Sequence, residues 1–215
     1  MTPADERRQR DARRKEFFNQ RAEGWLDRWH LDEETGTYTR YAAQFERMFS
    51  LIPMRPGETV LDLGCGSGVL VPYVLERVGP EGRLLEVDYA EQMIAVNRRL
   101  HADPRVSFST ASVDTLKPPA AHYDAVLCFA CFPHFERKAE TLAMIHHTLK
   151  PGGILAIVHF KSSQEMNEHH GHHPDVQHDR LPPETELRAM LMRNGLRVDG
   201  FIDEPGFYFV RAINA

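Results

Sequence analysis

Between residues 57 and 159 the chain alternates short apolar runs with longer segments of helical periodicity. The short runs are rich in β-branched and other apolar residues and stop at glycine, proline or polar turns, which predicts buried strands. The longer segments place apolar residues three or four positions apart, which predicts helices. Such alternation is typical of βαβ units in a parallel sheet with helices on both faces. The predicted strands are 59–63, 83–87, 106–109, 123–129 and 154–159, and the predicted helices between them are 69–78, 90–100 and 139–149.

The pattern changes after the last of these strands. Residues 161–180 are polar, rich in histidine and only weakly periodic, so we expect an irregular insertion. A helix is predicted from 182 to 193. Two apolar segments, 196–202 and 207–213, follow with a polar, proline- and glycine-containing turn between them. They predict an antiparallel hairpin that closes the sheet.

The N-terminal part of the chain has a helical pattern. Apolar residues recur at helical spacing within 17–29 and within 38–52. Residues 5–16 are almost entirely charged and of mixed sign, so we expect a frayed or solvated helix there, with a basic arm for RNA as the alternative. The sequence therefore predicts an N-terminal helical cap over 1–56 and an α/β core over 57–215.

Composition narrows the class of protein. Of 215 residues, 42% are hydrophobic and 27% are charged, and the net charge is −5 with neutral histidines. This mild acidity argues against a nucleic-acid binder, which is usually basic. No apolar run reaches the ~20 residues of a membrane span, and no secretory signal is visible. The three cysteines, an odd number, suit a reducing compartment, so we expect a cytoplasmic protein.

The stretch from Val60 to Gly68 places a Gly-x-Gly-x-Gly turn directly after a predicted buried strand. Glycines at such a turn let a ligand approach backbone N–H groups closely. Asp62 lies at the end of this strand, so we expect its carboxylate to face a cationic or hydrogen-bond-donating part of the ligand. Asp88 ends the next strand, 20 residues after Gly68. A carboxylate at that position is placed to accept hydrogen bonds from both hydroxyls of a ribose.

These residues resemble motif I of the class I S-adenosylmethionine (SAM)-dependent methyltransferases. Residues 87–93 are similar to the second motif of that superfamily, and residues 148–153 resemble the turn before its fifth strand. The segment that begins Phe17-Phe18-Asn19 is similar to the small-molecule branch that includes the ubiquinone/menaquinone-type methyltransferases. The resemblance implies an α/β, Rossmann-like fold with a seven-stranded, mostly parallel sheet. It also implies methyl transfer from SAM to a small-molecule acceptor.

The resemblance further implies which residues bind SAM. Family members often place an acid after the third strand to meet the adenine amino group. Here Ser112 takes that position, and Asp114 is the alternative partner. The implied contacts are Asp62 and Gly64 with the methionine amino group, Cys65 and Gly66 along the turn, Asp88 with the ribose, Tyr89, Met93, Ser112 and Val113 around the adenine, and Phe129 beside the methionine part.

Other interpretations fit the sequence less well. A nicotinamide-binding Rossmann domain would carry Gly-x-Gly-x-x-Gly, whereas Val69 occupies the sixth position here. It would also bring Asp62 close to a pyrophosphate, which the carboxylate would repel. Methylation of a macromolecule is disfavoured, because residues 131–134 (Cys-Phe-Pro-His) stand where an Asn-Pro-Pro-Tyr-type motif would be expected. A non-catalytic SAM- or metal-binding regulatory protein stays the alternative to an enzyme.

His134 is the predicted catalytic residue. It follows the fourth predicted strand, where family members place groups that touch the acceptor. A neutral imidazole there can take a proton from a hydroxyl, thiol or amine. The alternative is a hydrogen-bonded structural histidine. Cys128 and Cys131, just before it, have a spacing that zinc can use, but Cys128 lies in an apolar strand and fits a core position better.

Five of the 12 histidines lie between His169 and His178. This segment follows the fifth strand, so His159 at the end of that strand can join it. Imidazoles with Asp175 or Asp179 suit a divalent transition metal such as zinc, iron, nickel or manganese. Three alternatives stand: a metal site, a substrate lid that uses one or two histidines without metal, and a solvated loop. The predicted metal ligands are His159, His170, His173 and His178.

Aromatic residues of the predicted cap are expected to shield the reaction from water. They suggest a small, partly apolar acceptor, while the methylated atom, O, S, N or C, stays open. These residues are Phe18, Trp25, Trp29, Tyr38 and Tyr41.

Overall fold

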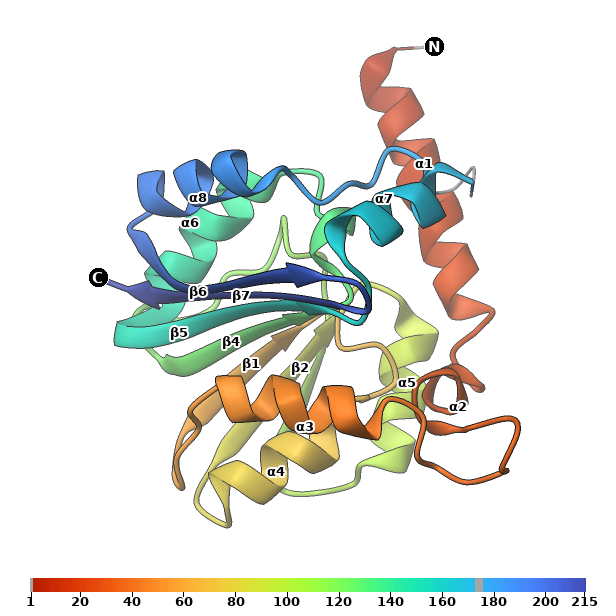
Figure 1. Ribbon diagram of the computed structural model, residues 1–215, viewed down its shortest axis with the longest axis vertical. Coiled ribbons are helices and arrows are strands. Elements are labelled where there is room, and N and C mark those ends of the chain that lie inside the picture. The colour runs from red at the N-terminus through yellow and green to blue at the C-terminus, as the bar shows by residue number, and fades with distance from the viewer. Residues whose placement is uncertain (1, 173–175) are drawn as a thin grey trace.

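The computed structural model describes residues 2–172 and 176–215. Within these ranges seven strands form one sheet in the order β3-β2-β1-β4-β5-β7-β6 (Figure 1). Neighbours among β1 to β5 pair in parallel, and β7 pairs antiparallel with both β5 and β6. The predicted fold class is therefore confirmed. The strands are β1 (Thr59–Leu63), β2 (Arg83–Asp88), β3 (Val106–Thr110), β4 (Tyr123–Phe129), β5 (Leu149–His159), β6 (Leu196–Glu204) and β7 (Phe207–Asn214).

The direction in which the sheet is built reverses at β1. Strands β2 and β3 lie on one side of β1, and β4 and β5 lie on the other. In open parallel sheets ligands bind at the carboxyl ends of the strands beside such a reversal. The loops that follow β1 and β4 are therefore the place to look for a site.

Helices cover both faces of the sheet (Figure 1). None of the helices in the described ranges is long and apolar enough to cross a membrane. The helices of one face are α3 (Ala42–Leu51), α4 (Val71–Val78) and α5 (Glu91–Leu100), and those of the other face are α6 (Lys138–Thr148) and α8 (Glu184–Arg193).

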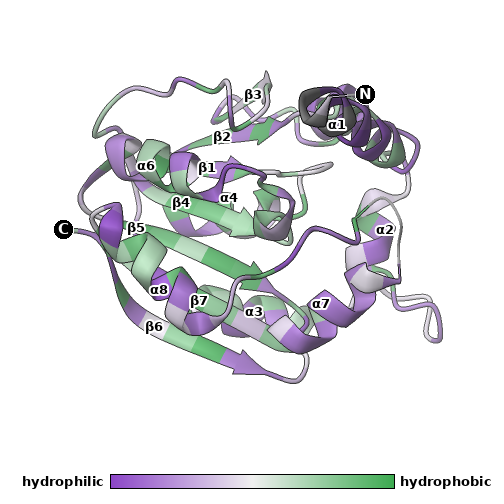
Figure 2. Cartoon of the chain, turned by 90° about the horizontal axis from the view of Figure 1, so that it is seen from above, coloured by the Kyte–Doolittle hydropathy of each residue, from purple (hydrophilic) through white to green (hydrophobic). Residues whose placement is uncertain are grey.

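Alternate residues of each strand enter two separate apolar cores. Val60 packs with Phe45 of α3 on one face, whereas its neighbour Leu61 packs with Leu142 of α6 on the other. Figure 2 shows the consequence as strands β4 and β5 that are hydrophobic over much of their length. Burial on both faces is typical of central parallel strands.

Three helices precede the sheet in the described ranges, and the first two differ from the prediction. Helix α1 (Pro3–Asn19) spans the charged segment, and α2 (Trp25–His30) follows after a break. Thr2 caps α1, because its hydroxyl accepts a hydrogen bond from the N–H of Asp5. The expectation of a solvated helix is wrong at Arg14, which is only 3% exposed. Figure 2 shows α1 as predominantly hydrophilic, and its buried Arg14 pairs with Asp179.

The histidine-rich insertion is also more regular than predicted. Its first half forms helix α7 (Ser163–Gly171). The Ser162 hydroxyl accepts from the N–H of Glu165, and the Glu165 carboxylate accepts from the N–H of Ser162. This Ser-x-x-Glu capping box is a helix-start signal that outweighed the weak periodicity. Figure 1 places α7 and α1 at the edge where the parallel strands end.

Two carboxyl groups are buried between β1, β2 and α5. Asp62 and Glu86 lie opposite each other in the register of β1 and β2 and are 1% and 0% exposed. Asn97 donates a hydrogen bond to Glu86 at 2.7 Å, whereas both oxygens of Asp62 lack a partner among the described residues. Burial raises the pKa of Glu86 to about 7. Burial, together with the charge of Glu86, raises the pKa of Asp62 well above its usual range.

Substitution Glu86→Gln should remove part of the pH dependence of stability. A carboxyl whose pKa is raised in the folded state binds its proton more tightly there than in the unfolded chain. The fold therefore gains stability as the pH falls through this range and loses it as the pH rises. The pKa of Glu86 is raised from 4.5 to about 7. Its ionisation should therefore lower the free energy of unfolding by about 1 kcal/mol as the pH rises from 6 to 8.

Denaturant unfolding at pH 6, 7 and 8 measures this effect. The variant should lose less stability over that interval than the unsubstituted chain. Glu81→Gln, at an exposed glutamate just before the same strand, is the control and should leave the pH dependence unchanged. Equal slopes for the unsubstituted chain and Glu86→Gln would contradict the assignment of a raised pKa to Glu86.

Candidate active site

The glycine turn after β1 is tied to the end of β2 by hydrogen bonds. The N–H of Gly64 donates to the carbonyl of Val87 at 2.8 Å, and the N–H of Gly66 donates to Oδ2 of Asp88 at 3.0 Å. Oδ1 of Asp88 accepts from the N–H of Ala90 at 2.9 Å. Gly64 and Gly66 have φ angles of 68° and 56°, which residues with a side chain adopt only at a cost. Asp88 therefore links the glycine turn that follows β1 to the loop that follows β2.

A first cavity of about 240 Å³ lies beside this turn, at the carboxyl ends of β1, β2 and β4 and against α1 and α2. Asp114, the alternative adenine partner, lines it as well as Ser112. The structure thus brings most of the predicted cofactor residues together, while their contact with a cofactor stays a prediction. Those that line this cavity are Gly64, Cys65, Gly66, Asp88, Tyr89, Met93, Ser112, Val113 and Phe129.

Asp62 is the predicted cofactor residue that does not line the first cavity. Its carboxyl lies behind the glycine turn, and Cys131 packs against the outer side of that turn. A Cβ atom at Gly64 would come within 2.5 Å of Cys131 Cβ. The buried and unpartnered carboxyl of Asp62 is a strong acceptor close to the cavity, and its role toward an amino group stays a prediction.

Four carboxyl groups line the first cavity, those of Asp11, Asp88, Asp114 and Glu136. Burial raises the pKa of Asp88 to about 6, against the lowering effect of the backbone N–H groups of Ala90, Gly66 and Tyr89. Burial and the neighbouring Glu136 carboxylate raise the pKa of Asp11. Among the described lining residues, Arg14 is the one lysine or arginine. The charged side chains of this wall are therefore predominantly acidic.

Aromatic residues of the N-terminal helices cover the turn. Trp25 of α2 lies directly over Gly66, because a Cβ atom there would come within 2.5 Å of Trp25 Nε1. Phe18 meets the edge of Trp25 with ring centroids 5.6 Å apart. Of the predicted aromatic cap, Tyr38 is an exception: it is 67% exposed and donates its hydroxyl hydrogen to Asp27 outside the cavities. The others line one or both cavities, namely Phe18, Trp25, Trp29 and Tyr41.

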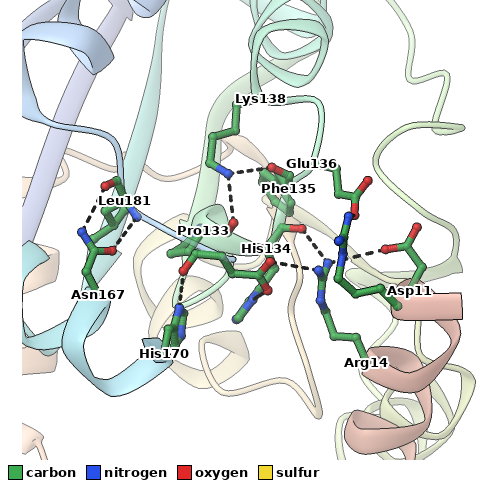
Figure 3. Close-up of polar contacts among 12 residues, drawn as sticks. Asp11, Arg14, Pro133, His134, Phe135, Glu136, Lys138, Asn167, His170 and Leu181 are labelled. Atoms are coloured by element: carbon green, nitrogen blue, oxygen red, sulfur yellow. Dashed lines mark hydrogen bonds and ion pairs between the residues drawn. The ribbon is translucent and has the colours of Figure 1, made fainter. Parts of the chain in front are cut away.

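His134 belongs to a buried polar network drawn from several segments (Figure 3). Its Nδ1 lies 2.7 Å from Oδ2 of Asp179, a residue that follows α7. Arg14 of α1 donates to Oδ1 of Asp179 and to the carbonyl of His134, both at 2.9 Å. Nδ1 of His170 lies 2.5 Å from the carbonyl of Asp179. Because an ionised Asp179 only accepts hydrogen bonds, this network assigns a proton to Nδ1 of His134 and leaves Nε2 outside it.

A second cavity of about 490 Å³ adjoins the first. It lies between α1, α2, the end of β5 and α7. His134 is at the boundary and lines both cavities. The residues that line both are Phe18, Trp25, Trp29, Ala130 and His134.

Two further histidines line the second cavity in neutral form. His159 at the end of β5 is 1% exposed, and neither ring nitrogen has a partner among the described residues. Burial, together with the nearby His134 and His170, lowers the pKa of His159 to about 3. Burial also lowers the pKa of His170 to about 4. A neutral His159 offers one donor and one acceptor nitrogen to a ligand, whereas Nδ1 of His170 is already used by the carbonyl of Asp179.

The predicted metal site has no support in the described part of the chain. His159 and His170 share the second cavity, but His178 is exposed and lines neither cavity. His173 lies outside the described residues. No group of three or more His, Cys, Asp or Glu side chains in the described ranges is arranged to hold a metal ion. Cys128 and Cys131 are buried free thiols, as expected of core residues.

Sequence reasoning missed the partners of His134. It treated Arg14 as one charge in a solvated helix and Asp179 as an added metal ligand. The two residues are separated by 165 positions, and no local spacing connects them. Interleaved aromatic residues at 17, 18 and 25 were the available signal that this end of the chain packs against the core.

Comparisons with known proteins agree with this geometry. Residues 60–153 match the model of a methyltransferase domain family. The malonyl-[acyl-carrier protein] O-methyltransferase of Halalkalibacterium halodurans is 32% identical over 100 residues, which are 45% of this chain and 36% of that protein. The ubiquinone/menaquinone biosynthesis C-methyltransferase UbiE of Hydrogenovibrio crunogenus is 33% identical over 111 residues, 50% of this chain and 44% of that protein. The chain thus spans less than half the length of these curated relatives.

Solved structures share the fold over most of the chain. A SAM-dependent methyltransferase from Aquifex aeolicus superposes with a TM-score of 0.66 at 23% identity, covering 79% of this chain and 89% of that one. One from Mesorhizobium loti superposes with a TM-score of 0.69 at 18% identity, covering 80% and 97%. Both neighbours have the same Rossmann-like architecture. The chain is thus similar to a methyltransferase domain family over residues 60–153, and it shares its fold with solved SAM-dependent methyltransferases.

Proposed function

We propose that this protein transfers the methyl group of SAM to a small-molecule acceptor held in the second cavity. The observation that carries the proposal is the pair of adjoining cavities with His134 at their boundary. The first cavity is built on the glycine turn and Asp88, and the second is closed by aromatic and histidine side chains. Two ligands in these cavities would meet beside one imidazole.

The residues of the first cavity fit SAM. Its ribose hydroxyls and adenine amino group are hydrogen-bond donors, and Asp88, Ser112 and Asp114 supply acceptors. SAM carries a sulfonium, which suits a cavity with four carboxyl groups, and when bound it supplies a methyl group already activated for attack. The unpartnered Asp62 is the acceptor that would take the amino group, which requires a shift of the turn in front of it. The Trp25 side chain now covers Gly66. It would therefore have to shift when the ligand binds.

His134 would act as the proton acceptor in this scheme. Asp179 holds Nδ1, so Nε2 can take the proton that a hydroxyl, thiol or amine loses as its heteroatom attacks the methyl carbon. Asp179 is then a positioning residue, and Arg14 keeps it in place. Cavity walls that exclude water would align the acceptor for in-line attack, which is the main contribution a protein makes to this reaction.

Substitution Asp88→Ala should weaken SAM binding by about 10- to 100-fold, the effect of losing about 1.5–3 kcal/mol of hydrogen bonding to a charged group. The variant also loses the acceptor that anchors Gly66. Isothermal titration with SAM and with S-adenosylhomocysteine measures the change, and circular dichroism checks that the fold persists. Asp114→Ala removes a carboxyl group of the same cavity that does not anchor the glycine turn. This variant should bind SAM more tightly than Asp88→Ala does. Unchanged affinity in Asp88→Ala would contradict the assignment of the first cavity to SAM.

Methyl-labelled SAM tests the transfer itself. Incubation with pools of small hydroxyl, thiol and amine compounds should yield a labelled product, and Asp88→Ala should reduce its formation in line with its affinity for SAM. Binding of SAM without labelled product from any pool would favour a non-catalytic SAM-binding protein.

With an acceptor found in this way, His134→Gln should lower kcat by about 10²- to 10⁴-fold at unchanged SAM affinity, the range for loss of a general base. Asp179→Asn should lower kcat less and shift the pH profile of kcat, because it disturbs the orientation and basicity of His134 without removing it. His178→Gln is the matched control, since His178 is next to Asp179 but exposed and outside both cavities. Equal kcat in His134→Gln and His178→Gln would contradict the role of His134.

A further inference from the structure

The charges that line the second cavity are of one sign. Of the 17 described residues that line it, four are arginine or lysine and none is aspartate or glutamate. The chain as a whole carries a net charge of −5, so this local excess of positive charge runs against the overall balance. The four cationic residues are Arg21, Arg28, Arg40 and Lys161.

None of these four side chains forms an ion pair with a carboxylate within the described residues. Asp32 acts electrostatically on Arg40 and Glu165 on Lys161, but neither acid is in contact with its cation or lines the cavity. Other arginines, such as Arg99 with Glu23, do have carboxylate partners. The cations of the second cavity are therefore available to a ligand.

Three of the four cations lie over aromatic rings of the same wall. The guanidinium of Arg21 lies 3.6 Å from the ring centroid of Phe17, that of Arg28 lies 5.4 Å from Trp25, and that of Arg40 lies 5.1 Å from Tyr41. Phe17, Trp25 and Tyr41 all line the cavity. Such cation–π contacts hold the guanidinium groups against the wall.

The inner part of the second cavity has a different character. Trp29 and Phe160 pack edge to face there, with ring centroids 6.1 Å apart. His159 is buried and neutral, with both nitrogens unpartnered among the described residues. A buried polar group without a partner is rare in native proteins and is explained when a ligand supplies the partner. The inner part therefore suits a flat apolar body with one polar group.

The two cavities also differ in sign. The first carries four carboxyl groups and suits a cationic ligand, whereas the second carries four cations without an ion-pair partner, of which Arg21 also donates to the carbonyl of Phe17, and no carboxyl group among its described lining residues. We propose that the second cavity binds a small organic anion, namely a flat aromatic or otherwise apolar body with a carboxylate, phosphate or sulfonate group held by Arg21, Arg28, Arg40 and Lys161. The binding claim stands on the cavity alone, and that this anion is the methyl acceptor rests on the proposed function.

A pair of fluorescent probes tests the binding claim. 8-Anilinonaphthalene-1-sulfonate and N-phenyl-1-naphthylamine share one aromatic body and differ by the sulfonate. In titrations the anionic probe should bind at least about tenfold more tightly than the neutral one, and its affinity should fall with added salt. Equal or tighter binding of the neutral probe, or no binding of the anionic probe, would overturn the proposal.

Variants locate the binding. The double substitution Arg28→Gln with Arg40→Gln should weaken binding of the anionic probe by about tenfold and leave the neutral probe within about twofold. Arg98→Gln is the matched control, because Arg98 also lies over a ring, that of Phe108, but outside both cavities. If the double variant binds the anionic probe as the unsubstituted protein does, the cations of the second cavity are not the anion site and the proposal fails.

Titration of SAM into the same samples separates this proposal from the proposed function. Unchanged SAM affinity in the double variant, together with loss of the anionic probe, supports two independent sites. SAM binding without any preference for the anionic probe overturns the anion site and leaves the methyltransferase proposal standing. Preference for the anionic probe without SAM binding supports the anion site and overturns the proposed function.

Discussion

A buried ion pair between Arg14 and Asp179 holds the candidate site together. Transfer of two opposite charges into a protein interior costs several kcal/mol per ion, and only good geometry with further hydrogen bonds offsets this cost. Here each oxygen of Asp179 has a partner, and Arg14 also donates to the carbonyl of His134. The pair connects the first helix of the chain with the segment after α7, across 165 positions. The pair therefore fixes the orientation of His134. It also fixes the roof of the site, by which we mean helix α1 and the segment that follows α7.

Helix α1 depends on this pair more than an ordinary helix would. Its composition is predominantly polar, so it has only a short apolar stripe, around Phe18, with which to bury surface (Figure 2). Additional attachment comes from Arg10 with Glu136 and from Lys15 with Glu91. The pair of Lys15 with Glu91 is the more exposed of the two, and exposed ion pairs contribute only about 0–1 kcal/mol. The roof of the site is thus held mainly by one buried charge pair and a few aromatic contacts.

The sequence predicted the core well and the roof poorly, for a physical reason. Strands β1 to β5 and the glycine turn follow from local signals, because apolar runs and glycines act within a few residues of the chain. That is why nine of the ten predicted cofactor residues line one cavity. The roof follows from long-range charge pairing. A mixed-charge segment looks solvated by local rules, and nothing near Arg14 indicates that Asp179 will neutralise it.

The density of histidines predicted a metal site that the described residues do not support, and the reason is related. A run of imidazoles suggests a metal, yet only contacts in three dimensions decide which nitrogens converge. His170 gives its Nδ1 to a backbone carbonyl, and His178 lies outside both cavities. His159, which belongs to no local motif, is the most deeply buried of them, and neither of its ring nitrogens has a hydrogen-bond partner among the described residues. Spacing along the chain could identify the segment but not its geometry.

The opposite signs of the two cavities bear on the chemistry at their boundary. In the proposed reaction, methyl transfer from a sulfonium would remove a positive charge from the first cavity, and a proton lost by the acceptor would place one on His134. The positive charge would thus move only a short way, from the first cavity to the imidazole of His134. There Asp179 lies 2.7 Å from Nδ1. A fixed carboxylate at that distance stabilises an imidazolium without any rearrangement of the protein. Arg14 holds that carboxylate in place beforehand, so the same ion pair that docks the first helix prepares the site for the charge it would receive.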